Sequence, residues 1–365
     1  MSDQPHNIPS LVGGFPTQAD FVPSILFAVA YGLSIIPFLI RFRNPNTRTY
    51  LLAIGTFIYS VERVVVWSIR AAQSHDHHLG ETLSKGRLVY QQVSFALGFI
   101  GFGSDCVAFM RAAMVNTTLE DPKRGSIDKP KERFWYRRAA DLAGLGWMIA
   151  TIPGAIGYSK MPGSAAHPED ADKLYRLRYV SSSAALFMFF FYFVLLRYVR
   201  NRTEWLDRRA VDVTCTVLSV ASVVAIYRLS VLHNTTSVLN VLPSTPPLYP
   251  PGSLTTTASK ATFYIFHALP ELIIAWAIQS LNIRAIFNTG AWGDWQGTDA
   301  RGGIARLRQN GVYVDGVGVQ GEVSWGPVGN WIQNRREGNA AKSVETERPT
   351  ASARTGSQVE LTETV

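Results

Sequence analysis

Long apolar stretches alternate with short polar loops from about Phe21 to Ile286. An α-helix needs about 20 mostly apolar residues to cross the hydrocarbon core of a bilayer. Seven stretches meet that length, and they cover residues 21–41, 50–70, 88–114, 139–158, 180–199, 211–232 and 261–283. The pattern predicts an all-α fold class, a polytopic membrane bundle of seven transmembrane helices. Six or eight spans are the alternatives, because the fourth stretch contains several glycines and Pro153.

The composition changes after the last apolar stretch. Residues 287–365 are rich in Gly, Arg, Glu, Ser and Thr and contain no long apolar run. This predicts a largely disordered cytosolic tail behind a membrane domain over residues 21–286, with residues 1–20 as an extracytoplasmic N-terminus. Within the tail, "GVYVDGVGVQGEV" suits either a hairpin or disorder, and its composition favours disorder. No basic region or small-residue cleavage site precedes the first stretch, which is expected to be a true span.

The charge distribution predicts the orientation. The formal net charge is +8, and the basic excess lies in the membrane part. It is interpreted as loop charge facing anionic lipid and not as a nucleic-acid site. The loops after the first, third and fifth stretches carry more than twice the Lys and Arg of the opposite loops. The positive-inside bias therefore predicts an extracellular or lumenal N-terminus and a cytosolic C-terminus, in the plasma membrane or an endomembrane.

Two outward-facing loops hold candidate sites. "SHDHH" contains His75, His77 and His78, whose imidazoles are weak candidates for binding a metal or for sensing external pH. The Pro- and Thr-rich stretch after His233 is expected to be extended and poorly ordered, and Asn234 begins a glycosylation sequon there. Both cysteines fall in apolar stretches, which predicts buried free thiols.

Ionisable residues inside the spans form the main candidate site. Such groups are expensive in hydrocarbon and tend to face a bundle interior or a water-filled cavity. We expect the second, sixth and seventh spans to enclose a polar cavity that binds a ligand, and Pro270 to bend the seventh helix. Arg228 is the expected counter-ion for one of the two glutamates. The candidate ligand-binding residues are Glu62, Arg228, Tyr264, His267 and Glu271. The equal alternatives are a structural hydrogen bond between helices for the two glutamates, and extension toward lipid headgroups for Arg228.

Other polar residues in the spans have simpler interpretations. Arginines near a span's end can extend toward lipid headgroups, and this is the favoured interpretation for Arg70 and Arg111. Asp105 is expected to make a structural polar contact, with an ion site or a proton-relay group as the alternatives. Asp141 and Asp212 are expected to cap helix starts.

Three segments carry a resemblance. "FIYSVERVVVWSIRAA", "AIYRLSVL" and "FYIFHALPELIIAWAIQSLNIRAIFNTG" together resemble an uncharacterised family of fungal seven-transmembrane proteins. The layout is similar, more distantly, to the fungal lipid-translocating-exporter family linked to aminocholesterol resistance. In that layout Glu62, Arg228 and Leu269-Pro270 occupy comparable places. The resemblance implies lipid handling.

Three functions remain open from the sequence. The first is an integral membrane protein that binds or translocates a lipid or small amphiphile, with membrane lipids as partners, no cofactor and no enzymatic activity. The second is a seven-span receptor-like sensor, although "DCVAFMRAAM" lacks an acid-Arg-aromatic triplet at the end of the third span. The third is an intramembrane metal-dependent lipid hydrolase, for which few ligands lie at depth. The sequence predicts no oligomeric state.

Overall fold

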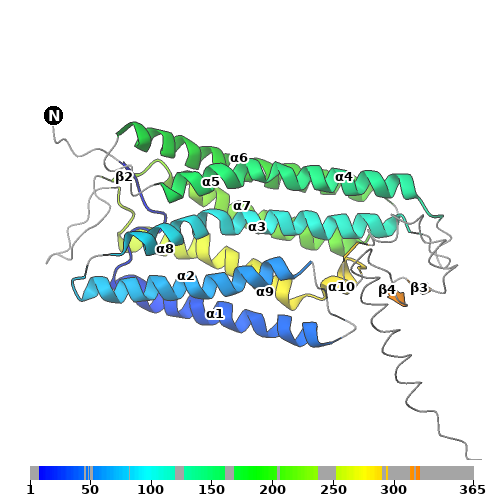
Figure 1. Cartoon of the computed structure of the whole chain (residues 1–365), viewed down its shortest axis with the longest axis horizontal. Coiled ribbons are helices and arrows are strands. Elements are labelled where there is room, and N and C mark those ends of the chain that lie inside the picture. Colours follow the sequence, from blue (N-terminus) through cyan, green and yellow to red (C-terminus); the bar gives the residue numbers. More distant parts are fainter. Residues whose placement is uncertain are drawn as a thin grey trace, which may run out of the picture.

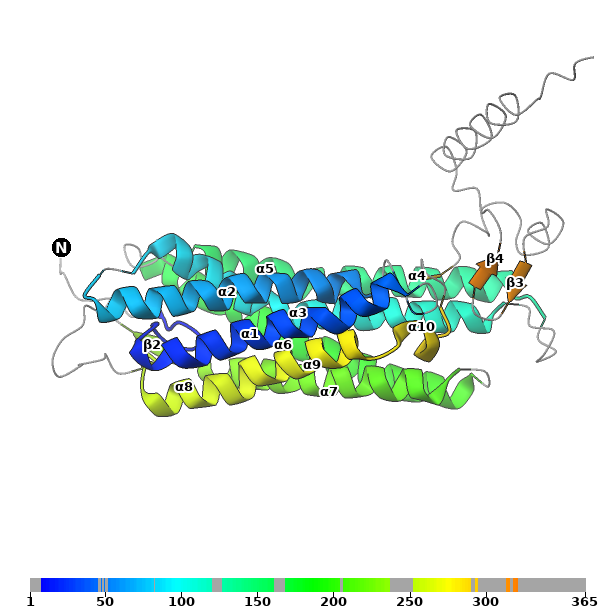
Figure 2. The same cartoon turned by 90° about the horizontal axis from the view of Figure 1, so that it is seen from below.

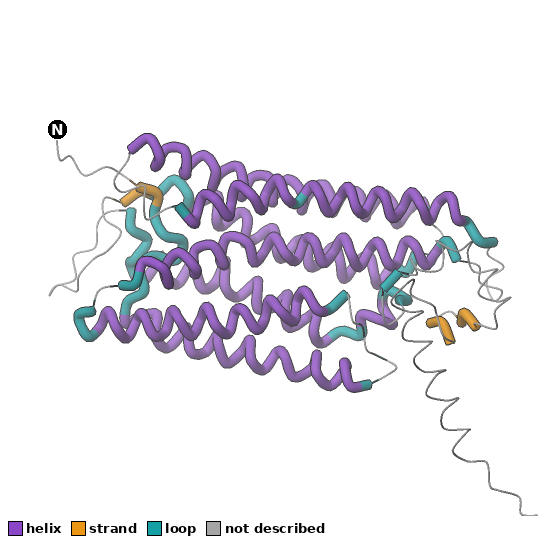
Figure 3. The backbone as a smooth tube through the Cα atoms, in the orientation of Figure 1, coloured by secondary structure: helices purple, strands orange, loops and turns teal. Residues whose placement is uncertain are grey.

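The computed structural model describes residues 8–44, 47, 49, 52–81, 83–119, 127–160, 168–203, 206–236, 252–289, 293–294, 313–315 and 318–320. Long helices lie side by side along the longest axis of the molecule, and two views at right angles show the same arrangement (Figures 1 and 2). Almost all of the described chain is helical, with short loops at both ends of the helices (Figure 3). The predicted all-helical bundle is therefore confirmed.

Ten α-helical segments and one π-helical turn make up the bundle within the described residues. In chain order these are α1 (Gln18–Arg43), α2 (Ile54–His78), α3 (Lys85–Thr117), α4 (Pro130–Gly146), α5 (Met148–Ser159), α6 (Pro168–Arg202), α7 (Arg208–Val231), α8 (Thr257–Phe263), the π-helical turn η2 (Tyr264–Ala268), α9 (Leu269–Ser280) and α10 (Ile283–Ile286). The segments α8, η2 and α9 follow one another without a gap, so they form one rod that corresponds to the seventh predicted span.

Six helices among the described residues are long and apolar enough to cross a membrane. They are Gln18–Arg43, Lys85–Thr117, Pro130–Ser159, Asp170–Arg202, Arg208–Val231 and Thr257–Ser280. These six helices indicate an integral membrane protein. Helix α2 has the length of a span, but its buried face carries polar and charged side chains, which lower its hydropathy. They include Ser60, Arg63, Arg70, Gln73 and Ser74.

Several helices extend beyond the predicted stretches. Helix α2 continues about two turns past Arg70, and α6 begins at Pro168, not near residue 180. The apolar signal ends where charged residues enter, yet Arg70 and Arg178 are fully buried and bonded inside the bundle. The fourth predicted stretch is two helices that meet at Trp147. Buried charges thus hide the true ends of these helices from a hydropathy pattern.

The N-terminal segment before α1 is buried at one end of the bundle. Leu11, Val12 and Phe15 are at most 1% exposed. The backbone of Val12 exchanges two hydrogen bonds with the Gln92 side chain of α3, at 3.0 and 3.1 Å. A short strand, β1 (Ile8–Pro9), pairs antiparallel with β2 (Thr235–Thr236). Residues 8–17 therefore close this end of the bundle, where the sequence predicted only a short terminus.

At the opposite end, few residues of the predicted tail are described. Phe287 packs against Phe109 of α3, with ring centroids 5.1 Å apart. Two strands, β3 (Tyr313–Asp315) and β4 (Gly318–Gln320), pair antiparallel. They lie in the stretch for which disorder was favoured over a hairpin, and the structure pairs the two strands there. Of the predicted tail, only residues 287–289, 293–294, 313–315 and 318–320 are described.

Three assignments near this end were wrong. Asp141 lies within α4, and Asp212 lies four residues past the start of α7, whose N-cap is Asp207. Both carboxylates make ion pairs: Asp141 with Arg111 at 2.7 Å, and Asp212 with Arg200 at 2.6 Å. Arg111 also contacts Asp294 at 2.9 Å, so it does not extend freely toward headgroups. Oppositely charged partners on neighbouring segments explain all three residues.

Candidate functional site

A buried cluster of charges lies beneath the N-terminal segment. This outer cluster consists of Asp20, Arg70, Lys260 and Tyr264, from α1, α2, α8 and η2. Arg70 Nη2 donates to Asp20 Oδ1 at 2.9 Å, and Tyr264 donates to the same oxygen at 2.7 Å. Lys260 Nζ donates to Asp20 Oδ2. One carboxylate therefore joins three helical segments and receives hydrogen bonds from two cations.

The same cations hold the N-terminal segment. Arg70 donates to the carbonyl of Gly13 at 2.7 Å, and Lys260 donates to the carbonyl of Phe15 at 2.9 Å. The prediction that Arg70 extends toward headgroups was wrong, because its side chain is fully buried. The sequence offered one signal that was missed. Asp20 lies just before the first apolar stretch. A buried cation such as Arg70 needs an acidic partner, and Asp20 is an acidic residue at the same end of the bundle.

A second set of polar residues crosses the middle of the bundle. We call it the polar row; it consists of Glu62 and Arg63 of α2, Glu271 of α9, His267 of η2, Arg228 of α7 and Tyr158 of α5. Arg63 Nη2 lies 3.1 Å from Glu271 Oε2, with both side chains fully buried. Arg63 Nη1 lies 3.4 Å from Glu62, which is 29% exposed. The row therefore runs from the surface of the bundle at Glu62 to its interior.

The interior half of the row is built around His267. Arg228 Nη1 lies 3.1 Å from His267 Nε2 and 2.9 Å from the carbonyl of Phe95, and Arg228 Nη2 donates to Tyr158. A guanidinium N–H only donates, so His267 Nε2 must accept. In the neutral imidazole the proton is then on Nδ1. That N–H faces Glu271 Oε2 at 3.8 Å, which is too long for a hydrogen bond.

Pro270 explains how His267 takes this position. A proline in a helix has no N–H to donate and clashes with the carbonyl four residues back, which is that of Phe266. The helix accommodates this through the π-helical turn η2, in which the N–H of Leu269 reaches the carbonyl of Tyr264. A π-helical turn rotates the residues within it relative to a regular helix, and such turns occur often at functional sites. The predicted bend is thus a local widening of the helix.

Three atoms in the row keep hydrogen-bonding capacity. Among the described residues, His267 Nδ1, Glu271 Oε2 and Arg228 Nε are buried and have no hydrogen-bond partner. Buried polar atoms usually have a partner, and each exception calls for a specific explanation. Two of these atoms are donors and one is an acceptor. All three belong to side chains that are buried inside the bundle.

The structure brings together most of the predicted ligand-binding residues, but with different partners. Arg228, His267 and Glu271 do meet in the interior. Arg63, and not Arg228, is the cation beside both glutamates, so the predicted pairing was wrong. Tyr264 belongs to the outer cluster. The side chains of the row contact one another directly, and the pockets described below lie elsewhere, so the structure does not support an open cavity here.

The remaining candidates lie apart from the row. His75, His77 and His78 occupy the last turn of α2 and not a flexible loop; His77 is buried, and the other two are exposed. No group of three or more metal-ligating side chains occurs within the described residues. The side chain of Asn234 donates to the carbonyl of Val231 at 3.0 Å, and its glycosylation stays a prediction. Asp105 accepts a hydrogen bond from Thr56 at 2.7 Å, as expected for a structural contact.

Comparison of the chain with protein-family models, with curated proteins and with solved structures found no match. The resemblance to fungal seven-transmembrane proteins therefore stays a prediction.

The position of Arg63 provides a test of the row. A Cβ at Gly98 of α3 would collide with the guanidinium of Arg63 and with the ring of Tyr59, whereas a Cβ at Gly101 would meet nothing within 4 Å. We expect Gly98→Ala to displace Arg63 and to lower the free energy of unfolding by about 2 kcal/mol or more. Gly101→Ala should leave stability unchanged or raise it slightly. Thermal unfolding of both variants measures the contrast, and equal midpoints would contradict the placement of Arg63.

Proposed function

We propose that the protein binds or translocates a lipid or small amphiphile within the membrane, without enzymatic activity. The proposal takes α2 as a seventh span, with the N-terminus outside and the basic end of the bundle in the cytosol. The polar row supports it, because seven helices can pack together without a buried row of charges. Replacing a buried ion pair by apolar residues is often neutral or stabilising, so its presence favours a role beyond stability.

The observation that carries the proposal is His267 Nδ1, which has no hydrogen-bond partner among the described residues and lies 3.8 Å from Glu271 Oε2. Glu271 Oε2 is ion-paired with Arg63 at 3.1 Å but accepts no hydrogen bond from a described residue. A hydroxyl oxygen can accept from His267 Nδ1 and donate to Glu271 Oε2. An ether or ester oxygen can only accept. We therefore propose an amphiphile whose polar group is a hydroxyl, as in a sterol or a diacylglycerol. Such a molecule would arrive from the bilayer at Glu62, where the row reaches the surface of the bundle.

Ligand-dependent thermal stabilisation of the purified protein tests this proposal. The panel pairs lipids that differ at the hydroxyl: cholesterol against cholestenone, and diacylglycerol against triacylglycerol. At a ligand concentration of about 100 Kd, we expect a hydroxyl-bearing partner to stabilise the protein by about 2.7 kcal/mol. The lipid of the same pair that lacks the hydroxyl should raise the stability of the protein only slightly.

Two variants identify the site. Glu271→Gln should weaken hydroxyl binding by tenfold or more, because a hydrogen bond to a charged acceptor is worth about 1.5–3 kcal/mol. Asp105→Asn is the matched control, since Asp105 is a carboxylate within the bundle that lies outside the polar row. Equal losses in both variants, or equal stabilisation by both members of a lipid pair, would contradict the proposal.

A further inference from the structure

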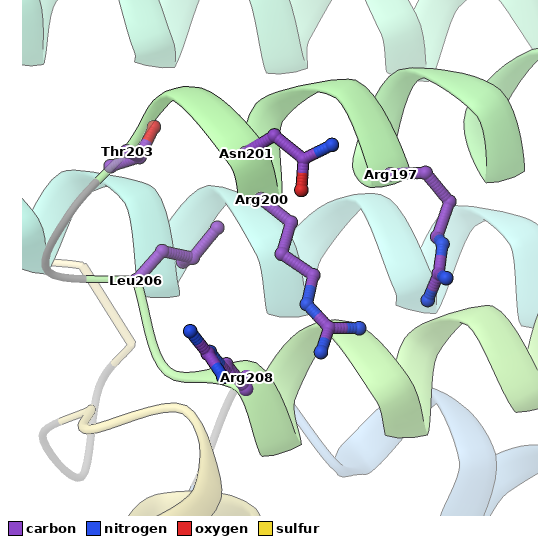
Figure 4. Close-up of a pocket in the computed structure, with 6 residues that line it drawn as sticks. All are labelled: Arg197, Arg200, Asn201, Thr203, Leu206 and Arg208. Atoms are coloured by element: carbon purple, nitrogen blue, oxygen red, sulfur yellow. The ribbon is translucent and has the colours of Figure 1, made fainter.

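A basic pocket lies where α6 ends and α7 begins, on the side of the molecule opposite the N-terminal segment. Its volume is about 570 Å³. Its lining consists of Arg197, Arg200, Asn201, Thr203, Leu206 and Arg208 (Figure 4). In the close-up, Arg200 reaches from α6 toward α7, and Arg208 stands at the start of α7. Three guanidinium groups from two helices therefore surround one space.

The pocket keeps a net positive charge. Asp212 lies 2.6 Å from Arg200 and 3.7 Å from Arg197. Within the described residues Arg208 forms no ion pair. Asp207 is also near, and its carboxylate accepts from the backbone N–H of Arg209 at 2.8 Å. Two described carboxylates against three guanidinium groups leave charge for an anion, and the planar guanidinium matches a phosphate well.

A second pocket, of about 250 Å³, lies on a neighbouring face of the same helices and is almost entirely apolar. On α6, Leu196 and Val199 line the apolar pocket, and the residues that follow each of them, Arg197 and Arg200, line the basic one. Consecutive helix residues point about 100° apart, so the two pockets flank the same two turns of α6. The other helices that line the apolar pocket are α3, α4 and α7, through residues that include Met110, Met114, Ala143 and Leu218.

From this juxtaposition we propose a site for an anionic phospholipid, distinct from the polar row. The phosphate headgroup occupies the basic pocket, and an acyl chain occupies the apolar pocket. Basic pockets between membrane helices at a cytoplasmic face suit such headgroups, and this end of the bundle carries most of the loop arginines and lysines. A soluble phosphate compound would use only the basic pocket, so the paired pockets favour a lipid.

Native mass spectrometry of the purified protein, titrated with phosphatidic acid or phosphatidylcholine of the same chains, tests the site. We expect phosphatidic acid to bind more than tenfold more tightly. Arg208→Gln and Arg200→Gln should each weaken its binding by about fivefold. Arg202→Gln is the matched control, because Arg202 lies on the same helix but stacks on Tyr198 outside the pocket. Equal binding of the two lipids, or an equal loss in Arg202→Gln, would overturn the proposal.

The acyl-chain half has its own test. Ala143→Phe fills the apolar pocket and should weaken phosphatidic acid binding by fivefold or more. Leu142→Phe is the control, because Leu142 is 71% exposed and does not line that pocket. Glycerol 3-phosphate, which has the phosphate without chains, should bind far more weakly than the lipid. If glycerol 3-phosphate binds as tightly as phosphatidic acid, or if both Phe variants behave alike, the lipid assignment is wrong.

Discussion

Replacing Arg63 by Met is expected to lower the free energy of unfolding by about 3–5 kcal/mol. The substitution leaves Glu271 fully buried without the guanidinium that lies 3.1 Å from it, and an unpaired buried charge is strongly destabilising. Arg63 also donates to Tyr59 at 2.7 Å and to Ser94, so two further groups lose a partner. Unfolding in a titration with sodium dodecyl sulfate, followed by circular dichroism, measures the change.

A double variant separates charge from packing. Arg63→Met combined with Glu271→Met removes both charges, and replacement of a whole buried ion pair by apolar residues is often close to neutral. We therefore expect the double variant to recover most of the lost stability. Arg202→Gln, at an exposed position, should change stability by less than about 0.5 kcal/mol. A double variant that is less stable than Arg63→Met alone would show that the pair is not the source of the effect.

Asp20→Ala is expected to have an effect of similar size at the outer end of the bundle. The side chain of Asp20 is fully buried and accepts hydrogen bonds from Arg70, Lys260 and Tyr264. Its removal leaves two buried cations without a carboxylate, and we expect a loss of about 3–5 kcal/mol. The two cations also bind the carbonyls of Gly13 and Phe15. Residues 8–17 should therefore exchange amide hydrogens faster in this variant.

Lys260→Met is the informative comparison, because it leaves the ion pair of Arg70 with Asp20 in place and removes the excess cation. We expect it to destabilise the fold clearly less than Asp20→Ala does. The rate of amide hydrogen exchange at residues 8–17 should rise modestly, since the hydrogen bond from Lys260 to the carbonyl of Phe15 is lost. If Lys260→Met proves as harmful as Asp20→Ala, then Asp20 is not the organising charge of the outer cluster.

The two buried sets of charges have different consequences. In the outer cluster, Asp20 accepts hydrogen bonds from three side chains, two of which also bind the N-terminal segment, although Arg70 Nη1 has no hydrogen-bond partner within the described residues. In the polar row, three buried atoms keep free capacity, and the row reaches the surface at Glu62. The first arrangement anchors the N-terminal segment, and the second is the one on which the proposed ligand site is based.

By itself the sequence determined the kind of fold. It also determined which few ionisable residues lie within the apolar stretches. Apolar stretches of about 20 residues have few alternatives to a membrane helix, because backbone groups in hydrocarbon must be bonded within the segment. The same reasoning singled out Glu62, Arg228, His267 and Glu271, and Pro270 marked the place where the last helix departs from α-helical geometry.

Only the tertiary structure decided which charge meets which. Glu62 and Arg63 are consecutive, yet one reaches the surface and the other is fully buried, because neighbouring helix residues point about 100° apart. Hydropathy along a chain does not specify how each helix is rotated about its own axis. That rotation assigned Arg63 to Glu271 and left Arg228 to His267. It likewise turned Arg70 inward to Asp20, a residue fifty positions away in the chain.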